Sequence, residues 1–318
     1  MSGRTGIDDP RMIWAQLVHL GYNMWSDRES PEWNIEYVSA ERKLRFDTSL
    51  WDDLLRKFVD DGLTMVVIDL GEGVAYESHP ELAVEGSWST SRLKGELEKM
   101  RAMGLEPIPK LNFSTAHDAW LGELARCVST PRYYAAVRDL IAEVIELFGH
   151  PPLFHLGMDE ETYGNQTNYD YAIVRQFDLW WHDFTFMVDE VEKGGARAWI
   201  WSDYLWHHPD LFFRKMPGSV VQSNWYYGHA FRDDIDGVKA YLQLEEHGYD
   251  QIPTGSNWSE PQNFQKTVRY CRERIAPERL LGFLQTVWKP TIERRRWRHF
   301  EASTEVGVAK AEYMASRG

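Results

Sequence analysis

The chain has 318 residues, of which 43% are hydrophobic and 26% are charged, so it is long enough to bury a large core. Its formal net charge of −14 argues against nucleic acid as a partner, because such binding depends on Lys and Arg side chains that neutralise phosphates. No apolar run approaches the roughly 20 residues that span a bilayer, so we expect no membrane association.

The start of the chain and its two cysteines bear on the compartment. "MSGRTGIDDPRM" is polar and lacks the apolar stretch of a secretory signal, so we expect a cytoplasmic protein or one whose leader has been removed. Cys127 and Cys271 lie far apart and lack metal-ligand spacing, which favours a reduced protein over one long-range disulfide. We predict no metal and no cofactor, and the sequence leaves the oligomeric state open.

Short apolar runs alternate with longer helical patterns along the chain. We predict strands at residues 12–20, 64–70, 105–112, 153–158, 196–201, 219–225, 251–256 and 280–287. Helical segments are expected to start near Thr48, Ser89, Pro131, Tyr169, His208, Ile235 and Pro261, with a last one from Thr291. This alternation predicts an α/β fold, a single-domain (β/α)8 TIM barrel over residues 1–318. An open doubly wound sheet is the competitor, but no glycine-rich phosphate motif follows the first run.

Function in such a barrel gathers where the C-terminal ends of the strands meet the following loops. Polar residues accumulate at these predicted ends, and Trp occurs at five of the eight. Aromatic faces beside hydrogen-bonding groups suit a carbohydrate, which has an apolar C–H face and a hydroxyl rim. We therefore predict a carbohydrate ligand and a binding site that includes His19, Asn23, Asn112, His117, His155, Trp201, Asp203, Trp225, Tyr226, Asn257, Trp258 and Trp288.

The stretch "FHLGMDEE" (residues 154–161) ends a predicted buried strand in three consecutive acids. Side chains alternate along a strand, so Asp159 and Glu160 would point in opposite directions unless the chain bends after Met158. With such a bend, both carboxyl groups reach the pocket. A carboxyl group beside another one, within apolar walls, should have a raised pKa, as a general acid at a glycosidic oxygen requires.

Three segments carry a resemblance to glycoside hydrolase family 20, the β-N-acetylhexosaminidases. "HLGMDE" (residues 155–160) resembles the fourth-strand signature His-x-Gly-Gly-Asp-Glu of that family and is the most specific of the three. "GLEPIPKLNFSTAHDAWL" (residues 104–121) is similar to its third-strand segment, and "GFLQTVWKP" (residues 282–290) to the end of its eighth strand.

The resemblance implies roles for particular residues. Glu160 would be the general acid/base, and Asp159 would orient a substrate 2-acetamido group that attacks the anomeric carbon in place of an enzyme nucleophile. The sugar would be boxed by three indole rings and the acid pair supported by two imidazoles, from Trp201, Trp225, Trp288, His117 and His155.

The chain also departs from the family pattern. "VHLGYN" lacks the first-strand Arg that grips sugar hydroxyls, Lys110 stands where the third strand has Glu, and Met158 replaces the second Gly of the signature. "TGSNWSE" lacks the seventh-strand Tyr that bonds the acetamido carbonyl, which Tyr226 or Tyr227 could replace only from the neighbouring strand. The expectation is thus a divergent, single-domain relative without the accessory domain of the family.

Other interpretations stay open at this point. A retaining glycosidase could use Glu160 or Glu161 as acid/base and Glu260 as nucleophile, although Glu260 beside Pro261 also suits a helix N-terminus. A barrel that binds sugar without cleaving it is a further alternative. A metal-dependent hydrolase is disfavoured, because the sequence has neither a His-x-His pair on the first strand nor a His-Glu-x-x-His helix.

Overall fold

The structure, a computed structural model, describes residues 12–29, 38–175 and 177–316. Eight parallel strands form one sheet in the order β8-β7-β6-β5-β2-β1-β10-β9. They are β1 (Ile13–His19), β2 (Met65–Asp69), β5 (Glu106–Lys110), β6 (Leu153–His155), β7 (Arg197–Trp201), β8 (Val221–Ser223), β9 (Thr254–Ser256) and β10 (Gly282–Thr286). Each lies within one of the eight predicted runs, so the strand prediction is confirmed.

The sheet curls until its two edge strands meet. The backbone N–H of Ile252 donates to the carbonyl of Gln222 at 2.9 Å, and that of Thr254 donates to the carbonyl of Asn224 at the same distance. These bonds join the β9 edge to the β8 edge and bring the ends of the sheet together. The predicted (β/α)8 barrel is therefore the fold of the described chain.

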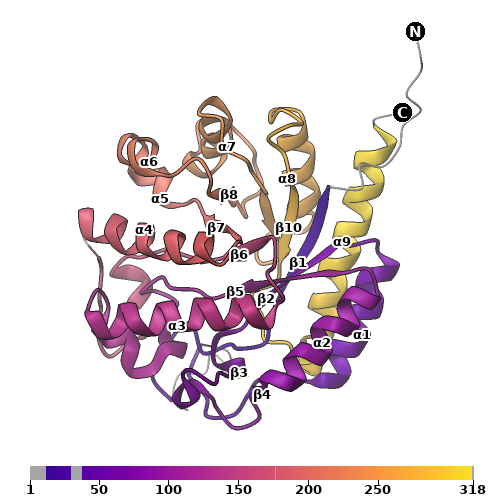
Figure 1. Cartoon of the computed structure of the whole chain (residues 1–318). Helices are drawn as coiled ribbons and strands as arrows, with labels where there is room; N and C mark the ends of the chain where they lie inside the picture. The colour runs from indigo at the N-terminus through magenta and orange to yellow at the C-terminus, as the bar shows by residue number, and fades with distance from the viewer. Residues whose placement is uncertain (1–11, 30–37, 176, 317–318) are drawn as a thin grey trace.

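Helices surround the strands (Figure 1). They are α1 (Thr48–Asp60), α2 (Thr90–Ala102), α3 (Pro131–Leu147), α4 (Asp178–Lys193), α5 (Tyr204–His207), α6 (Pro209–Lys215), α7 (Asp236–Glu246), α8 (Asn263–Arg272) and α9 (Arg296–Ala315). Local chemistry fixes several of their starts: Thr130 caps α3 by accepting from the N–H of Tyr133 at 3.3 Å, and Pro131 follows as the first helical residue. Between β2 and α2, the two-residue strands β3 (Val74–Ala75) and β4 (Trp88–Ser89) form a small ribbon.

Two predicted helix positions differ from the structure. The helix expected near Tyr169 begins at Asp178, because Gln166 makes two bonds with the backbone of Ile173 (2.7 and 2.8 Å) that hold the preceding segment as a loop. The helix expected near His208 is divided between α5 and α6, and the break falls before Pro209, where a continuous helix would lose a backbone bond.

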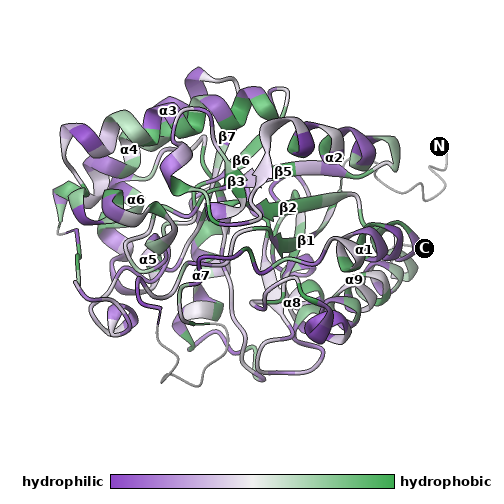
Figure 2. Cartoon of the chain, turned by 90° about the horizontal axis from the view of Figure 1, so that it is seen from below, coloured by the Kyte–Doolittle hydropathy of each residue, from purple (hydrophilic) through white to green (hydrophobic). Residues whose placement is uncertain are grey.

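The apolar core has two parts. The larger lies between the strands and the helices, whose ribbons carry both hydrophobic and hydrophilic residues (Figure 2). A smaller cluster fills the inside of the barrel and includes Leu17, Val67, Ile108 and Trp199. Because side chains occupy the interior, the site can form only at the mouth of the barrel.

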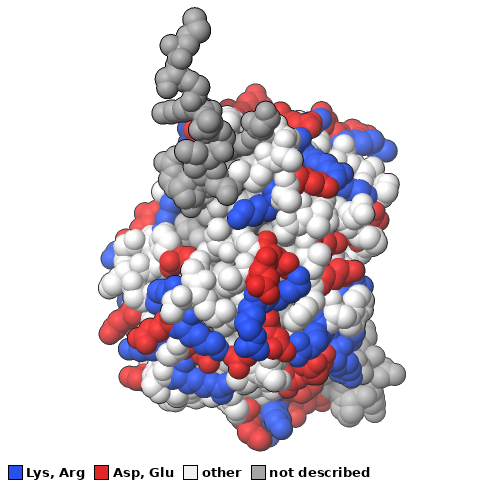
Figure 3. Space-filling view, turned by 90° about the vertical axis from the view of Figure 1, so that its right-hand side faces the viewer, with Lys and Arg blue, Asp and Glu red and all other residues white. Residues whose placement is uncertain are grey.

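Charges of both signs are interspersed on the side of the molecule where α1 and α9 lie (Figure 3). The basic run at residues 293–299 leads into α9 there, and Arg296 pairs with Asp53 at 2.7 Å and with Glu293 at 2.6 Å. Both are surface ion pairs between partly exposed side chains. Among the helices described, none combines the length and the apolar character needed to cross a bilayer.

Candidate active site

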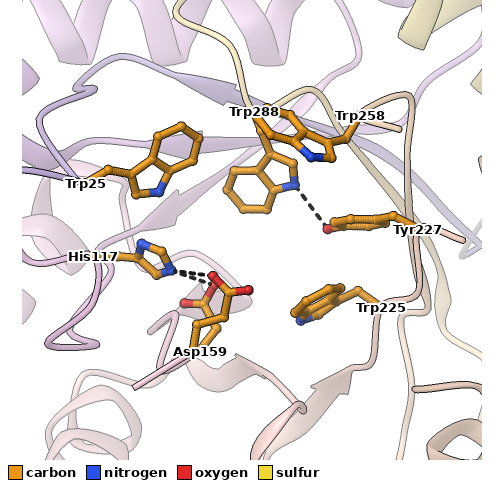
Figure 4. Close-up of a pocket in the computed structure, with 8 residues that line it drawn as sticks. Trp25, His117, Asp159, Trp225, Tyr227, Trp258 and Trp288 are labelled. Atoms are coloured by element: carbon orange, nitrogen blue, oxygen red, sulfur yellow. Dashed lines mark hydrogen bonds and ion pairs between the residues drawn. The ribbon is translucent and has the colours of Figure 1, made fainter. Parts of the chain in front are cut away.

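A cavity of about 230 Å³ opens at the C-terminal ends of the strands (Figure 4). Its walls come from the loops after β1, β5, β6, β8, β9 and β10, although these loops are far apart in the sequence. The lining residues are Trp25, His117, Asp159, Glu160, Trp225, Tyr227, Trp258 and Trp288. Aromatic faces and carboxylates thus meet in one enclosed space at the end of the barrel where function is expected.

The chain bends sharply after β6, as predicted. Gly157, Met158 and Glu160 have φ values of 72°, 71° and 55°, in the left-handed region. A Cβ on Gly157 would lie 2.0 Å from Oδ1 of Asn112, so only glycine fits there. The left-handed backbone is unfavourable at Met158 and Glu160. This bend replaces the alternation of a strand and brings the side chains of Asp159 and Glu160 to the cavity together.

One imidazole links the two acids. Nε2 of His117 lies 3.4 Å from Oδ2 of Asp159 and 3.3 Å from Oε2 of Glu160 (Figure 4). On the other side of Asp159, Oδ1 accepts a hydrogen bond from Nδ2 of Asn112 at 2.9 Å. The Asp159 side chain is therefore fixed from two directions, whereas that of Glu160 is 37% exposed and faces the open cavity.

The third acid of the run turns away from the cavity. Oε2 of Glu161 lies 2.6 Å from Nη2 of Arg175, whose side chain is 1% exposed. Arg175 also pairs with buried Asp183 at 3.3 Å. Three consecutive acids thus divide into two that face the cavity and one that holds the loop between β6 and α4.

The pKa of Asp159 is raised, as predicted for a carboxyl group beside another one, whereas that of Glu160 is lowered. Burial raises the pKa of Asp159, and the nearby Glu160 charge adds to this shift. Burial also raises the pKa of Glu160, but the hydrogen bond and charge of His117 outweigh it, so that pKa is lowered. For His117 itself, burial lowers the pKa, and the charges of Asp159 and Glu160 reverse the shift upward. The prediction of a raised pKa for the general acid is therefore wrong for Glu160 in this structure.

Asp203 supports the cavity from behind. Its Oδ2 accepts the backbone N–H of Glu160 at 2.8 Å, and its Oδ1 lies 3.4 Å from the indole nitrogen of Trp225. Burial, together with the charge of Asp159, raises the pKa of Asp203 to about 7. Asp203 therefore fixes the acid-bearing bend and one wall of the cavity together.

The aromatic walls are held by contacts with one another. The indole N–H of Trp288 donates to the hydroxyl of Tyr227 at 3.1 Å, and the ring of Tyr227 stacks on Trp225 with centroids 4.9 Å apart. Across the cavity, Trp25 meets Trp258 edge to face at 6.2 Å. The cavity is thus mainly aromatic, and Tyr227 forms part of its lining.

The structure brings six of the predicted site residues into this lining: Asp159, Glu160, His117, Trp225, Trp258 and Trp288. Asn112 and Asp203 lie just behind the acids, as described above. Trp201 lies beneath the cavity, 1% exposed, with its ring 5.8 Å from that of Trp288. Its predicted place as one side of a sugar box is therefore not where the structure puts it.

Five other predicted residues also lie outside the described lining. His19 and His155 are buried in the layer beneath it. Asn23 bonds to the carbonyl of Glu41 at 2.7 Å, Asn257 bonds to the carbonyl of Arg298 at 3.0 Å, and Tyr226 packs against Phe231 at 5.2 Å. Asn23, Asn257 and Tyr226 follow the ends of their strands, so alternation no longer sets the direction of their side chains.

Two lining residues were absent from the predicted set, Trp25 and Tyr227. Both stand in stretches that combine aromatic and polar residues, "NMWSD" and "SNWYYG". The mixed aromatic and polar composition around Trp25 indicates a residue that lines a sugar site. Of the two adjacent tyrosines, Tyr226 and Tyr227, the second lines the cavity.

The layer beneath the cavity accounts for Lys110. Its ammonium group forms a buried ion pair with Asp69, and Nδ1 of His19 lies 3.4 Å from Oδ2 of that acid. Burial acts to raise the pKa of Asp69, but the charge of Lys110 and the hydrogen bond with His19 lower it to about 2. Burial lowers the pKa of both His19 and His155. The side chains of Lys110, Asp69, His19 and His155 thus form a buried polar layer beneath the cavity.

Glu260 lies away from the acid pair. Its Oε1 is bound to Nδ1 of His229 at 2.6 Å and to the ammonium group of Lys266 at 2.8 Å. Its carbonyl accepts the N–H of Asn263, the first residue of α8, at 3.3 Å. It therefore occupies the position before a helix that the sequence suggested, and it lies outside the described cavity lining.

Known structures share this fold. A β-N-acetylhexosaminidase from Bacteroides fragilis superposes with a TM-score of 0.64 at 16% identity, over 93% of this chain and 66% of that one. An exo-β-N-acetylglucosaminidase of family 20 from Vibrio harveyi gives 0.61 at 13% identity, over 93% and 54%. The family 20 β-N-acetylhexosaminidase from Streptomyces coelicolor gives 0.60 at 14%, over 94% and 65%.

The chain thus spans between about half and two thirds of the length of these three proteins. At such identities the likeness establishes the fold, which is the (β/α)8 barrel that the alternation of apolar runs and helical patterns predicts. No protein-family model matches the sequence, and no curated protein sequence matches it.

Proposed function

We propose that this protein is a glycosidase of the β-N-acetylhexosaminidase type and a divergent relative of glycoside hydrolase family 20. One observation carries the proposal: the carboxyl groups of Asp159 and Glu160 converge on His117 inside a cavity walled by indole rings. The aromatic faces suit the C–H face of a sugar, and the paired carboxyl groups suit cleavage of a glycosidic bond. The shared fold supports this assignment.

Glu160 is the general acid/base in this proposal. A sugar in the cavity would bury this partly exposed carboxyl group further, and the added desolvation would raise its pKa from the lowered value in this structure. Glu160 then protonates the glycosidic oxygen as the bond to the leaving group breaks. In the second step it takes a proton from the water that attacks the anomeric carbon.

The nucleophile in this proposal is the acetamido oxygen of the substrate, which attacks the anomeric carbon and forms an oxazolinium ion. Asp159 accepts the acetamido N–H and stabilises the positive charge that develops there. Its fixation by Asn112 suits this orienting role. Water then opens the ring with retained configuration at the anomeric carbon.

In this proposal Tyr227 replaces the seventh-strand tyrosine that the sequence lacks, and it binds the acetamido carbonyl of the substrate. Its hydroxyl accepts from the indole N–H of Trp288 at 3.1 Å and lies 3.3 Å from Oγ1 of Thr286, and an acetamido carbonyl in the cavity would replace Thr286 as the acceptor of its proton. Since this bond strengthens as the carbonyl becomes a nucleophile, removing the hydroxyl should affect acetamido substrates in particular.

The Tyr227→Phe variant tests this proposal. We expect wild type to cleave p-nitrophenyl N-acetyl-β-glucosaminide in preference to p-nitrophenyl β-glucoside, and Tyr227→Phe to lower kcat/KM for the former by about 10- to 100-fold. Tyr226→Phe is the matched control, because that ring packs on Phe231 outside the cavity, and it should retain wild-type rates. Wild-type protein that binds sugars but cleaves no aryl glycoside would instead indicate a non-catalytic sugar-binding barrel.

A further inference from the structure

The carboxyl pair and the imidazole of His117 form a compact set of metal-ligating groups. Nε2 of His117 lies 3.4 Å from Oδ2 of Asp159 and 3.3 Å from Oε2 of Glu160, and Figure 4 shows both contacts meeting at this one nitrogen. One ligand atom from each of the three residues lies within 4.8 Å of the other two. Within the described ranges, no other three His, Cys, Asp or Glu side chains bring ligand atoms so close together. A single ion could therefore contact all three side chains at once.

The separations between these atoms fit a tetrahedral zinc ion. With zinc bonds of about 2.0–2.2 Å, two ligands at the corners of a tetrahedron lie roughly 3.3–3.5 Å apart. Magnesium holds six ligands at about 2.0–2.1 Å in an octahedron, so its neighbouring ligands lie only roughly 2.9 Å apart. The two distances of 3.4 and 3.3 Å from His117 match the zinc geometry. An imidazole nitrogen among the ligands also favours zinc over magnesium and calcium, which prefer oxygen.

The surroundings fit a reversibly bound ion rather than a permanent one. Asp159 has the outer support that a metal ligand needs, because its Oδ1 accepts from Nδ2 of Asn112 at 2.9 Å. A metal-bound imidazole usually donates its second N–H as well, but Nδ1 of His117 is buried and has no hydrogen-bond partner among the described residues. The side chain of Glu160 is 37% exposed toward the cavity, which leaves a path for the ion to enter and leave.

A zinc ion at this point would stop the proposed reaction. It would hold Glu160 as a carboxylate, which could no longer donate a proton to the glycosidic oxygen. It would also hold the carboxylate of Asp159, which the substrate acetamido group needs. The ion would share the cavity of about 230 Å³ with the sugar, so zinc and sugar should exclude each other.

We infer that His117, Asp159 and Glu160 bind zinc reversibly, and that the bound ion inhibits the protein in competition with its sugar substrate. Zinc is here an inhibitor and not a cofactor. The inhibition rests on the proposed function, whereas the binding site rests only on the geometry of the three side chains.

Isothermal titration calorimetry with zinc sulfate, on untagged protein freed of metals by EDTA and dialysis, measures the site directly. We expect one saturable zinc site per chain, and magnesium sulfate should show no saturable binding. Glu160→Gln and His117→Ala should each weaken zinc binding by at least about tenfold, because each removes one ligand. The first of these keeps the shape of the side chain, so the test does not depend on the folding of the second.

His79 provides the matched control. It also lies near two carboxylates, with Nδ1 2.8 Å from Oε1 of Glu81 and Nε2 3.9 Å from Oδ2 of Asp139. Since these acids contact different nitrogens of the ring, one ion cannot bind both of them together with the imidazole. His79→Ala should therefore keep the zinc affinity and the activity of wild type.

Initial rates with p-nitrophenyl N-acetyl-β-glucosaminide measure the inhibition. Zinc should raise the apparent KM and leave kcat unchanged, and EDTA should restore the rate. Zinc binding that Glu160→Gln and His117→Ala leave unaffected, inhibition that leaves KM unchanged, or activation by zinc would overturn the inference.

The two measurements separate the inference from the proposed function. If wild type cleaves the glycoside but binds no zinc, the inference fails and the proposed function stands. If wild type binds zinc through these three residues but cleaves no glycoside, the proposed function fails, and the inhibition fails with it, whereas the zinc site stands.

Discussion

Glu160→Gln should lower kcat/KM for p-nitrophenyl N-acetyl-β-glucosaminide by about 10²- to 10⁴-fold, because the amide cannot donate or accept the catalytic proton. The backbone N–H of residue 160 keeps its bond to Asp203, and the amide has nearly the same shape as the carboxyl group. We therefore expect the variant to fold and to bind sugar. Initial rates give the first quantity, and equilibrium titration with N-acetylglucosamine gives the second.

A substrate whose leaving group needs no protonation tests more specifically whether Glu160 is the general acid. The loss of activity should be smaller for the 2,4-dinitrophenyl glycoside, whose leaving oxygen is already stable as an anion. Glu260→Gln is the control, since its carboxylate is bound to His229 and Lys266, and the variant should keep activity within about threefold of wild type. Inactivity of Glu260→Gln, with full activity of Glu160→Gln, would support the mechanism with Glu260 as nucleophile.

Glu161→Ala should affect stability in the first place, and it should lower the free energy of unfolding by about 3–5 kcal/mol. The substitution leaves the guanidinium of Arg175 buried with only part of its compensating charge, because Asp183 remains 3.3 Å away. Removing one partner of a buried ion pair costs far more than removing one at the surface. Urea denaturation at pH 7, followed by tryptophan fluorescence, measures the change.

The matched control for Glu161 is an exposed Glu–Arg pair in the same protein. Glu123 is 85% exposed in its side chain and lies 3.6 Å from Arg132. We expect Glu123→Ala to change the free energy of unfolding by less than about 1 kcal/mol. Equal effects of Glu123→Ala and Glu161→Ala would contradict the structural role assigned to the third acid.

Much of the fold is predictable from the sequence, because short apolar runs between helical patterns give all eight strands and hence the barrel. The start of α4 is not, since residues 169–177 contain enough apolar side chains to resemble a helix. The conformation of residues 169–175 depends on Gln166, which bonds the backbone of Ile173, and on Arg175, which pairs with Glu161. Such long-range polar contacts leave no periodic pattern in the sequence.

Site residues that closely follow a strand can be predicted from the sequence, whereas those further along the loops are harder to predict. The acid run could be placed at the mouth because it directly follows an apolar strand. The choice between Tyr226 and Tyr227 could not be made, because alternation stops where β8 ends at Ser223. The lowered pKa of Glu160 depends on His117, which comes from the loop after β5 and meets the acids only in the folded barrel.

In the proposed mechanism, the side chains of Asp159 and Glu160 act together on a sugar whose own acetamido group attacks the anomeric carbon. A thiazoline that mimics the cyclic intermediate should therefore be a strong inhibitor. We predict that the thiazoline binds wild type at least about a hundredfold more tightly than N-acetylglucosamine does, and that Asp159→Asn removes most of this advantage. Turnover of glycosides by wild type that the thiazoline leaves unaffected would contradict the account.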